Sequence, residues 1–171
     1  MKPFRQGDLD GLCGIYSVVN AVRYIKKLSS EQSEDLFYQC LSAIEKENRL
    51  SDIVAKGINL TILTTLFKEI IDPNFGIKRT RPFHKRKDVS LDCYWNHIAT
   101  FLKTPERVVL ASIDCSDCIG HWSIIIKASH KVFHMYDSYE DKRWYRRLLS
   151  TQRTTKSRPY IVSPPHTFFL G

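Results

Sequence analysis

The sequence predicts an α+β fold in which an N-terminal helical part packs on a C-terminal antiparallel β-sheet. Apolar residues recur at helical spacing as far as about residue 102. After Pro105 the pattern changes to short apolar or alternating runs, which are typical of strands. Helices followed by strands is the order of an α+β domain. A chain of 171 residues also suits one domain with a sizeable core, so we expect residues 1–171 to form a single domain.

The helical part is expected to hold four helices. A serine before acidic residues is typical of a helix N-cap, and Asn59 is suited to the same role. Proline cannot continue a helix without losing a hydrogen bond, so Asp72-Pro73 is expected to end the third helix. The expected helices run from Cys13 to about Lys27, from Ser29 or Ser30 onward, from Asn59 to residue 71, and from about Ser90.

The C-terminal part is expected to fold as successive strands. Ser129, His130 and Lys131 fit a hairpin turn between the second and third of them. Residues 76–80 form a possible short strand ahead of a basic loop at 79–87, which we interpret as a solvated connector. The expected strands cover residues 108–113, 121–127, 132–136, 144–149, 160–162 and 167–170.

Charge and cysteine content limit the possible functions but do not identify one. Lys and Arg outnumber Asp and Glu by 26 to 18, which gives a formal charge of +8 and predicts attraction to acidic partners. No apolar run is long enough for a signal peptide or a membrane span, so we expect a cytoplasmic protein, or an effector translocated without a cleaved signal. Five cysteines form an odd set without the look of a disulfide framework, which fits a reducing compartment with at least one free thiol.

The segment 6–20 carries the first half of a candidate active site. Cys13 is expected at the first turn of a helix, where unpaired amide groups and the helix dipole favour an anion and hence a nucleophilic thiolate. Gly11 and Gly14 flank the sulfur without side chains, which allows a tight turn and leaves room for a substrate. The side-chain amide of Gln6 is a candidate donor to a developing oxyanion, beside the N–H of Cys13.

The hairpin carries the second half. His121 begins one expected strand and Asp137 ends its partner, so antiparallel pairing should place them side by side. Asp137 would then fix the imidazole tautomer while His121 moves a proton to and from Cys13. Gly120 would keep the approach to the imidazole clear, and Trp122 would line the cleft or serve the core.

The remaining metal-type residues are weaker candidates. Cys115 and Cys118 form one Cys-x-x-Cys pair, whereas a zinc site needs four ligands at suitable spacing. The other five histidines lack the setting of His121, with a glycine before it and a carboxylate on the partner strand. We therefore expect neither a metal nor another cofactor.

Together, Gln6, the run Asp-Gly-Leu-Cys-Gly-Ile-Tyr-Ser at 10–17, Gly-His-Trp at 120–122 and Asp137-Ser138 resemble the papain-like cysteine protease superfamily. The layout looks most like its compact bacterial branches, including bacteriocin leader peptidases and papain-like type III effectors. The resemblance implies that Gln6 is the oxyanion donor, Cys13 the nucleophile, His121 the general base and Asp137 the orienting residue. The sequence departs from the papain pattern in two places. Seven positions separate Gln6 from Cys13, one more than in papain. Ile15, followed by Tyr16, stands where papain has an aromatic residue after the glycine that follows its cysteine.

The sequence thus predicts a thiol hydrolase that cleaves a peptide or isopeptide bond in a protein or peptide substrate, which the basic charge suggests is acidic. Deamidation of a protein glutamine, or transfer of its acyl group to an amine, is the alternative with the same residues. A non-catalytic basic module that binds nucleic acid is a third hypothesis, based on the two basic stretches 79–87 and 142–158, the second of which is interleaved with Trp144, Tyr145 and Tyr160. A solvated sheet face is the preferred interpretation of that stretch. The oligomeric state is left open.

Overall fold

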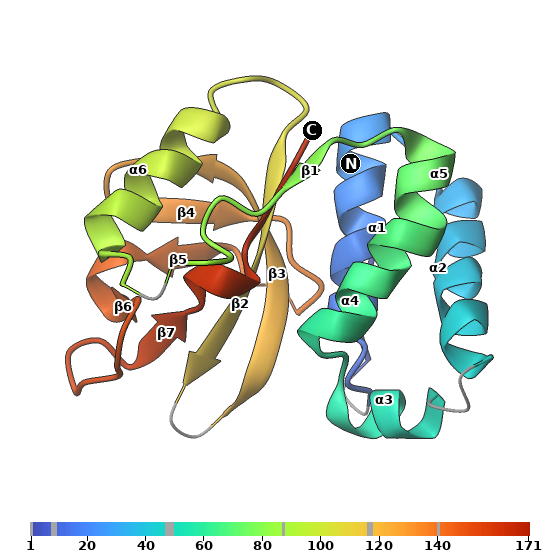
Figure 1. Cartoon of the computed structure of the whole chain (residues 1–171), viewed down its shortest axis with the longest axis horizontal. Helices are drawn as coiled ribbons and strands as arrows, with labels where there is room; N and C mark the ends of the chain where they lie inside the picture. Colours follow the sequence, from blue (N-terminus) through green and yellow to red (C-terminus); the bar gives the residue numbers. More distant parts are fainter. Residues whose placement is uncertain (1, 8–9, 47–49, 87, 116–117, 140) are drawn as a thin grey trace.

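The computed structural model describes residues 2–7, 10–46, 50–86, 88–115, 118–139 and 141–171. Its elements form three layers, in which one group of helices covers one face of a sheet and a single helix, α6, lies against the other face (Figure 1). The helices are α1 Cys13–Lys26, α2 Ser30–Glu45, α3 Leu50–Lys56, α4 Leu60–Leu66, α5 Asp72–Phe75 and α6 Leu91–Phe101. The predicted α+β class is confirmed.

Polar side chains begin three of the predicted helices. Ser29 accepts a hydrogen bond from the backbone N–H of Gln32, and the Gln32 side chain accepts one from the N–H of Ser29, which completes a capping box at α2. Asn59 caps α4 in the same way, at 3.0 Å from the N–H of Ile62. Ser90 caps α6. The expected starts of these helices are therefore confirmed.

Two parts of the helical half differ from the prediction. Residues 50–56 were not predicted as a helix but form α3, which buries only Ile53 of its seven residues and so has little periodic apolar signal. The proline at position 73 does not end the third helix. A π-helical turn over Phe67–Ile71 follows α4, with the N–H of Asp72 bonded to the carbonyl of Phe67, and Pro73 then falls in the first turn of α5, where a missing N–H is tolerated.

The sheet has eight strands among the described residues, and all the pairs except one are antiparallel. The order runs β1-β8-β2-β3-β4-β5, with β7 pairing with the far end of β2 and, in parallel, with β6. The strands are β1 Arg79–Thr80, β2 Val108–Cys115, β3 Cys118–Ala128, β4 Val132–Met135, β5 Arg143–Tyr145, β6 Leu149–Ser150, β7 Tyr160–Val162 and β8 Phe168–Leu170. The single strand expected over 144–149 is wrong, because a 3₁₀ turn at Arg146–Leu148 divides it into β5 and β6.

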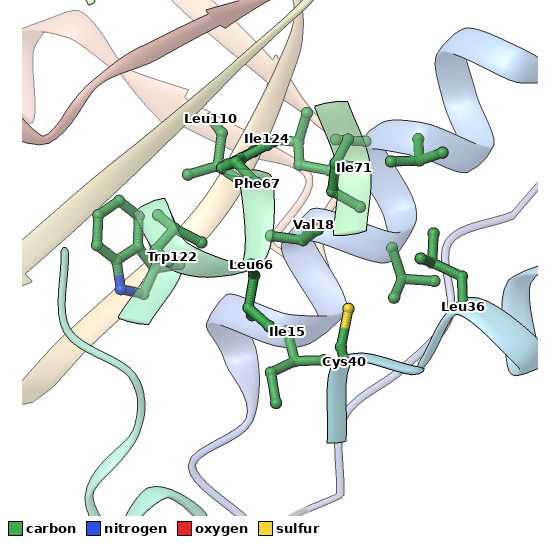
Figure 2. Close-up of a cluster of buried hydrophobic side chains, with 14 of the residues drawn as sticks. Ile15, Val18, Leu36, Cys40, Leu66, Phe67, Ile71, Leu110, Trp122 and Ile124 are labelled. Carbon is green, nitrogen blue, oxygen red and sulfur yellow. The ribbon is translucent and has the colours of Figure 1, made fainter. Parts of the chain in front are cut away.

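Alternation along the central strands produces a core on each face of the sheet. Leu110 and Ile124 face the layer of α1 and α4 and belong to the same core as the buried side chains of α1, α2 and α4 (Figure 2). Their neighbours Ala111 and Ile125 face α6, where the rings of Trp95 and Phe133 stack. Since β2 and β3 are buried on both faces, their sequences are nearly continuous apolar runs.

Candidate active site

Cys13 is the first residue of α1, as predicted, and it lies at the boundary between the helical layer and the sheet. The turn that leads into the helix is held by the carboxylate of Asp10, which accepts hydrogen bonds from the N–H groups of Leu12 and Gly7, both at 3.0 Å. Cys13 has 7% of its surface exposed. Its N–H belongs to the first turn, whose amide groups have no partner within the helix.

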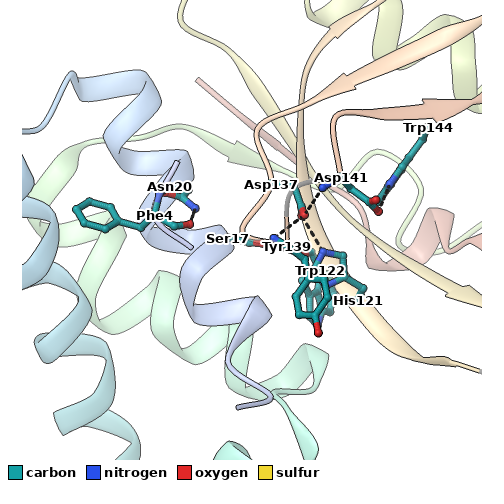
Figure 3. Close-up of polar contacts among 9 residues, drawn as sticks. All are labelled: Phe4, Ser17, Asn20, His121, Trp122, Asp137, Tyr139, Asp141 and Trp144. Carbon is teal, nitrogen blue, oxygen red and sulfur yellow. Dashed lines mark hydrogen bonds and ion pairs between the residues drawn. The ribbon is translucent and has the colours of Figure 1, made fainter. Parts of the chain in front are cut away.

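The β3–β4 hairpin brings His121 and Asp137 together. His121 lies on β3, and Asp137 follows the end of β4 by two residues. The His121 Nε2 and Asp137 Oδ1 atoms are 2.7 Å apart, and the Asp137 side chain is fully buried (Figure 3). The side chain of Cys13 lies near enough to His121 to raise the pKa of the imidazole, and both residues line the same cleft. One imidazole is thus bonded to a carboxylate and lies beside a thiol.

Electrostatics favour the charged form of this imidazole. Burial lowers the pKa of His121, but its hydrogen bonds to Asp137 and Cys13 and the negative charge of both partners outweigh burial and raise the pKa to about 10. Burial raises the pKa of Asp137, while the hydrogen bond and positive charge of His121 lower it below its ordinary value. The arrangement is therefore suited to a protonated imidazole beside the Asp137 carboxylate.

The carboxylate of Asp137 also organises the loop that follows it. Its Oδ2 atom accepts hydrogen bonds from the N–H of Tyr139 at 2.7 Å and of Asp141 at 3.1 Å. The side chain of Asp141 in turn accepts a hydrogen bond from the indole of Trp144 (Figure 3). Tyr139, Asp141 and Trp144 were not among the predicted site residues. The available signal was the aspartate at the end of a predicted strand, since aspartate side chains often bond the backbone a few residues on.

Gln6 lies beside this centre. Its backbone N–H donates to the carbonyl of Ser138 at 3.0 Å, which ties the segment before α1 to the segment after Asp137. The Gln6 side-chain amide donates to the carbonyl of Asp10. Because an amide group has two N–H donors, this contact leaves one for another acceptor.

The glycines serve close packing. A Cβ on Gly14 would lie 2.3 Å from a side-chain carbon of Ile58, so the room expected there for a substrate is filled by protein. A Cβ on Gly11 would lie 2.7 Å from the backbone nitrogen of Gly57, and the N–H of Gly11 donates to Val54. The expectation that Gly14 borders the substrate is therefore corrected, whereas Gly11 does line the cleft described below.

Gly120 and Trp122 flank His121 on β3. A Cβ on Gly120 would lie 2.3 Å from the carboxylate of Asp114 on the paired strand. Trp122 is 6% exposed, and its indole donates to the carbonyl of Ile58, while its own carbonyl accepts from Ser17. Trp122 therefore combines the two roles expected for it, because it packs in the core and also lines the cleft.

A cleft of about 680 Å³ opens over these residues. Its lining comes from the turn before α1, the segment 55–58, the loop after Asp137, and strands β5, β6 and β7. Cys13 and His121 both line it. A solute in this cleft can therefore reach the sulfur and the imidazole together.

The remaining cysteines divide into free and bonded. Cys40 and Cys93 are free thiols, as is Cys13, so the expectation of at least one free thiol is confirmed. Cys115 takes part in a disulfide bond. Residues 116 and 117 and the side chain of Cys118, which belong to the Cys-x-x-Cys pair, lie outside the described residues. No group of three metal-type side chains gathers in the described part of the chain.

Comparison with known proteins gives no family for this chain: no protein-family model matches it, and no curated protein does. Among the described helices, none combines the length and the apolar character that crossing a membrane requires.

Proposed function

We propose that the protein is a cysteine-dependent hydrolase that cleaves a peptide or isopeptide bond, with Cys13 as nucleophile, His121 as general acid and base, and Asp137 as the orienting residue. The observation that carries the proposal is the single imidazole that bonds the Asp137 carboxylate and lies beside Cys13, with His121 and Cys13 both lining one cleft. A helix-borne cysteine, followed in the chain by a histidine on a strand and an aspartate just after the neighbouring strand, also supports a papain-like fold.

The reaction begins from the ion pair of a Cys13 thiolate and a protonated His121, in which the thiol proton already resides on the imidazole. The thiolate attacks the carbonyl carbon, and the carbonyl oxygen becomes an oxyanion. His121 then gives its proton to the leaving nitrogen, the carbon–nitrogen bond breaks, and a thioester remains on Cys13. Water attacks the thioester, His121 takes a proton from the water, and that proton returns to the sulfur as the acid leaves.

Two donors are suited to the oxyanion. The first is the N–H of Cys13, which lies in the first turn of α1 and is aligned with the helix dipole. The second is the side chain of Gln6, which lines the same cleft and keeps one N–H after bonding Asp10. Paired donors of this kind stabilise charge that develops only in the transition state.

The proposal is tested with a mixture of denatured proteins as substrate. Wild-type protein should produce new peptide termini, detected by mass spectrometry, and Cys13→Ala should produce none. The matched control is Cys93→Ala, which removes a free thiol outside the cleft and should leave cleavage unchanged. Glutamine converted to glutamate without chain cleavage would instead identify a deamidase. Neither product with wild-type protein would contradict the proposal.

A further inference from the structure

The part of the cleft formed by β5 carries a cation that has no carboxylate partner among the described residues. Arg143 begins β5 and is exposed, and no carboxylate lies within ion-pair distance of it among the described residues. Lys56, the other cation that lines the cleft, pairs with Asp52 at 3.1 Å. Arg143 is therefore the charge in the cleft that is free to meet a ligand.

The acidic groups of the cleft are already engaged. Asp10 accepts two backbone N–H groups in the turn before α1. Asp141 accepts the indole N–H of Trp144. A ligand carboxylate beside Arg143 would therefore find a donor that lacks a partner, in a protein whose formal charge is +8.

Exposed aromatic rings flank the same arginine. Tyr139, Tyr145 and Tyr160 are 55%, 39% and 39% exposed, and all three line the cleft. Side chains alternate along β5, so Arg143 and Tyr145 lie on the same exposed face of the strand, while Trp144 between them is buried. Tyrosine and arginine are enriched where proteins bind other proteins, because they combine apolar area with hydrogen bonding.

We infer that the β5 wall of the cleft binds a peptide segment with an acidic side chain next to an apolar one, the carboxylate on Arg143 and the apolar group against Tyr145 and Tyr160. This inference rests on the proposed function, since it describes the substrate of that same site. Arg143 and the neighbouring tyrosines would then determine which peptide segments the protein prefers.

An acidic peptide fits this wall better than a nucleic acid does. Binding of a nucleic-acid strand requires several cations that follow its phosphates. Arg146 is ion-paired with Asp92, and Arg147 lies over the ring of Tyr145, 5.9 Å from its centroid. One free cation among tyrosines, close to a thiol and an imidazole, matches a single carboxylate on a chain that also presents an amide bond.

The experiment measures binding without catalysis. In the Cys13→Ala protein, fluorescence anisotropy compares two short labelled peptides that differ only by Glu or Lys beside a leucine. The Glu peptide should bind about tenfold more tightly than the Lys peptide, and Arg143→Glu should abolish or reverse that preference. Arg153→Glu, an equal charge change at an exposed position outside the cleft, should preserve the preference. Tyr160→Ala should weaken both peptides alike.

Equal binding of the two peptides, or a preference that survives Arg143→Glu, would overturn the inference. So would a single-stranded oligonucleotide that binds more tightly than the Glu peptide and loses its binding on Arg143→Glu. Hydrolysis is measured separately with the wild-type protein. A clear Glu preference without hydrolysis would therefore contradict the proposed chemistry and leave the binding wall intact.

Discussion

At the scale of single residues, Asp137 has two separate roles, one toward His121 and one toward the loop that follows it. One carboxylate oxygen bonds His121, and the other bonds the backbone of the loop at Tyr139 and Asp141. Removing the side chain would therefore disturb the loop as well as the imidazole. A substitution that keeps the shape and removes the charge separates the two effects.

We predict that Asp137→Asn lowers peptide cleavage by about 100-fold or more while the protein stays folded. The amide can still accept the loop hydrogen bonds, but it no longer stabilises the imidazolium, and general acid–base catalysis contributes about 10²–10⁴ in rate. The pKa of His121, followed by NMR, should fall well below about 10. An unchanged rate together with an unchanged histidine titration would show that Asp137 only supports the loop.

At the scale of the elements, helix α2 stabilises the helix that carries Cys13. Arg23 on α1 donates to the carbonyl of Ser29 and to the hydroxyl of Ser33, so the start of α2 is fastened to α1. Leu36 and Cys40 of α2 are buried in the same core as α1. The capping box at Ser29 therefore contributes to the position of α1 as well as to α2.

We predict that Ser29→Ala lowers the free energy of unfolding by about 1 kcal/mol, since the capping hydroxyl accepts an N–H that would otherwise lack a partner. Urea denaturation followed by circular dichroism measures the change. Ser42→Ala, at an exposed position inside the same helix, serves as the control and should have little effect. Equal losses in both variants would contradict a specific role for the cap.

The prediction from sequence succeeded where one element carries its own signal. The helices with apolar stripes and polar caps, and the alternating strand β4, follow from local pattern. The helix end predicted at Pro73 was wrong because a π-helical turn precedes it and places Pro73 in the first turn of α5, where no backbone N–H is required. Helix α3 was not predicted because only one of its residues is buried.

For a related reason, only part of the candidate site could be predicted from the sequence. Cys13, His121 and Asp137 have distinctive residue types at suggestive places, whereas the filling of the space beside Gly14 by Ile58 depends on contacts between segments distant in sequence. The hydrogen bond of Asp141 with Trp144 depends on how the loop folds around Asp137. Such contacts leave no periodic trace.

At the scale of the whole molecule, the site exists only where the helical layer meets the sheet. Gln6 bonds Ser138, Ser17 bonds the carbonyl of Trp122, and the indole of Trp122 bonds Ile58. These contacts join segments that are far apart in the chain. Because they hold Cys13 against His121, global stability and the charge state of the site are linked.

The sign of this linkage follows from the two pKa changes. The raised pKa of His121 contributes stability that is fully present below its ordinary value of 6.5 and is lost as the pH rises through about 10. The lowered pKa of Asp137 contributes stability that is present above 3.8 and is lost as the pH falls below that value. The pair therefore stabilises the fold most between about pH 4 and 6.5.

We predict that the difference in unfolding free energy between the wild type and Asp137→Asn is largest near pH 6 and shrinks by a few kcal/mol, to order of magnitude, as the pH approaches 10. Denaturant titrations across this range measure it. The difference between the two proteins is used because it cancels titrations elsewhere in the chain. A constant difference from pH 6 to 10 would contradict the pairing.

The most direct measurement of the central claim is the rate at which iodoacetamide alkylates each thiol at pH 6, resolved by mass spectrometry. Cys13 should react much faster than Cys93, and Cys40, whose pKa burial raises to about 12, should stay unmodified. His121→Ala should slow the labelling of Cys13 and leave that of Cys93 unchanged. Labelling of Cys13 no faster than Cys93, and indifferent to His121→Ala, would contradict a nucleophile activated by His121.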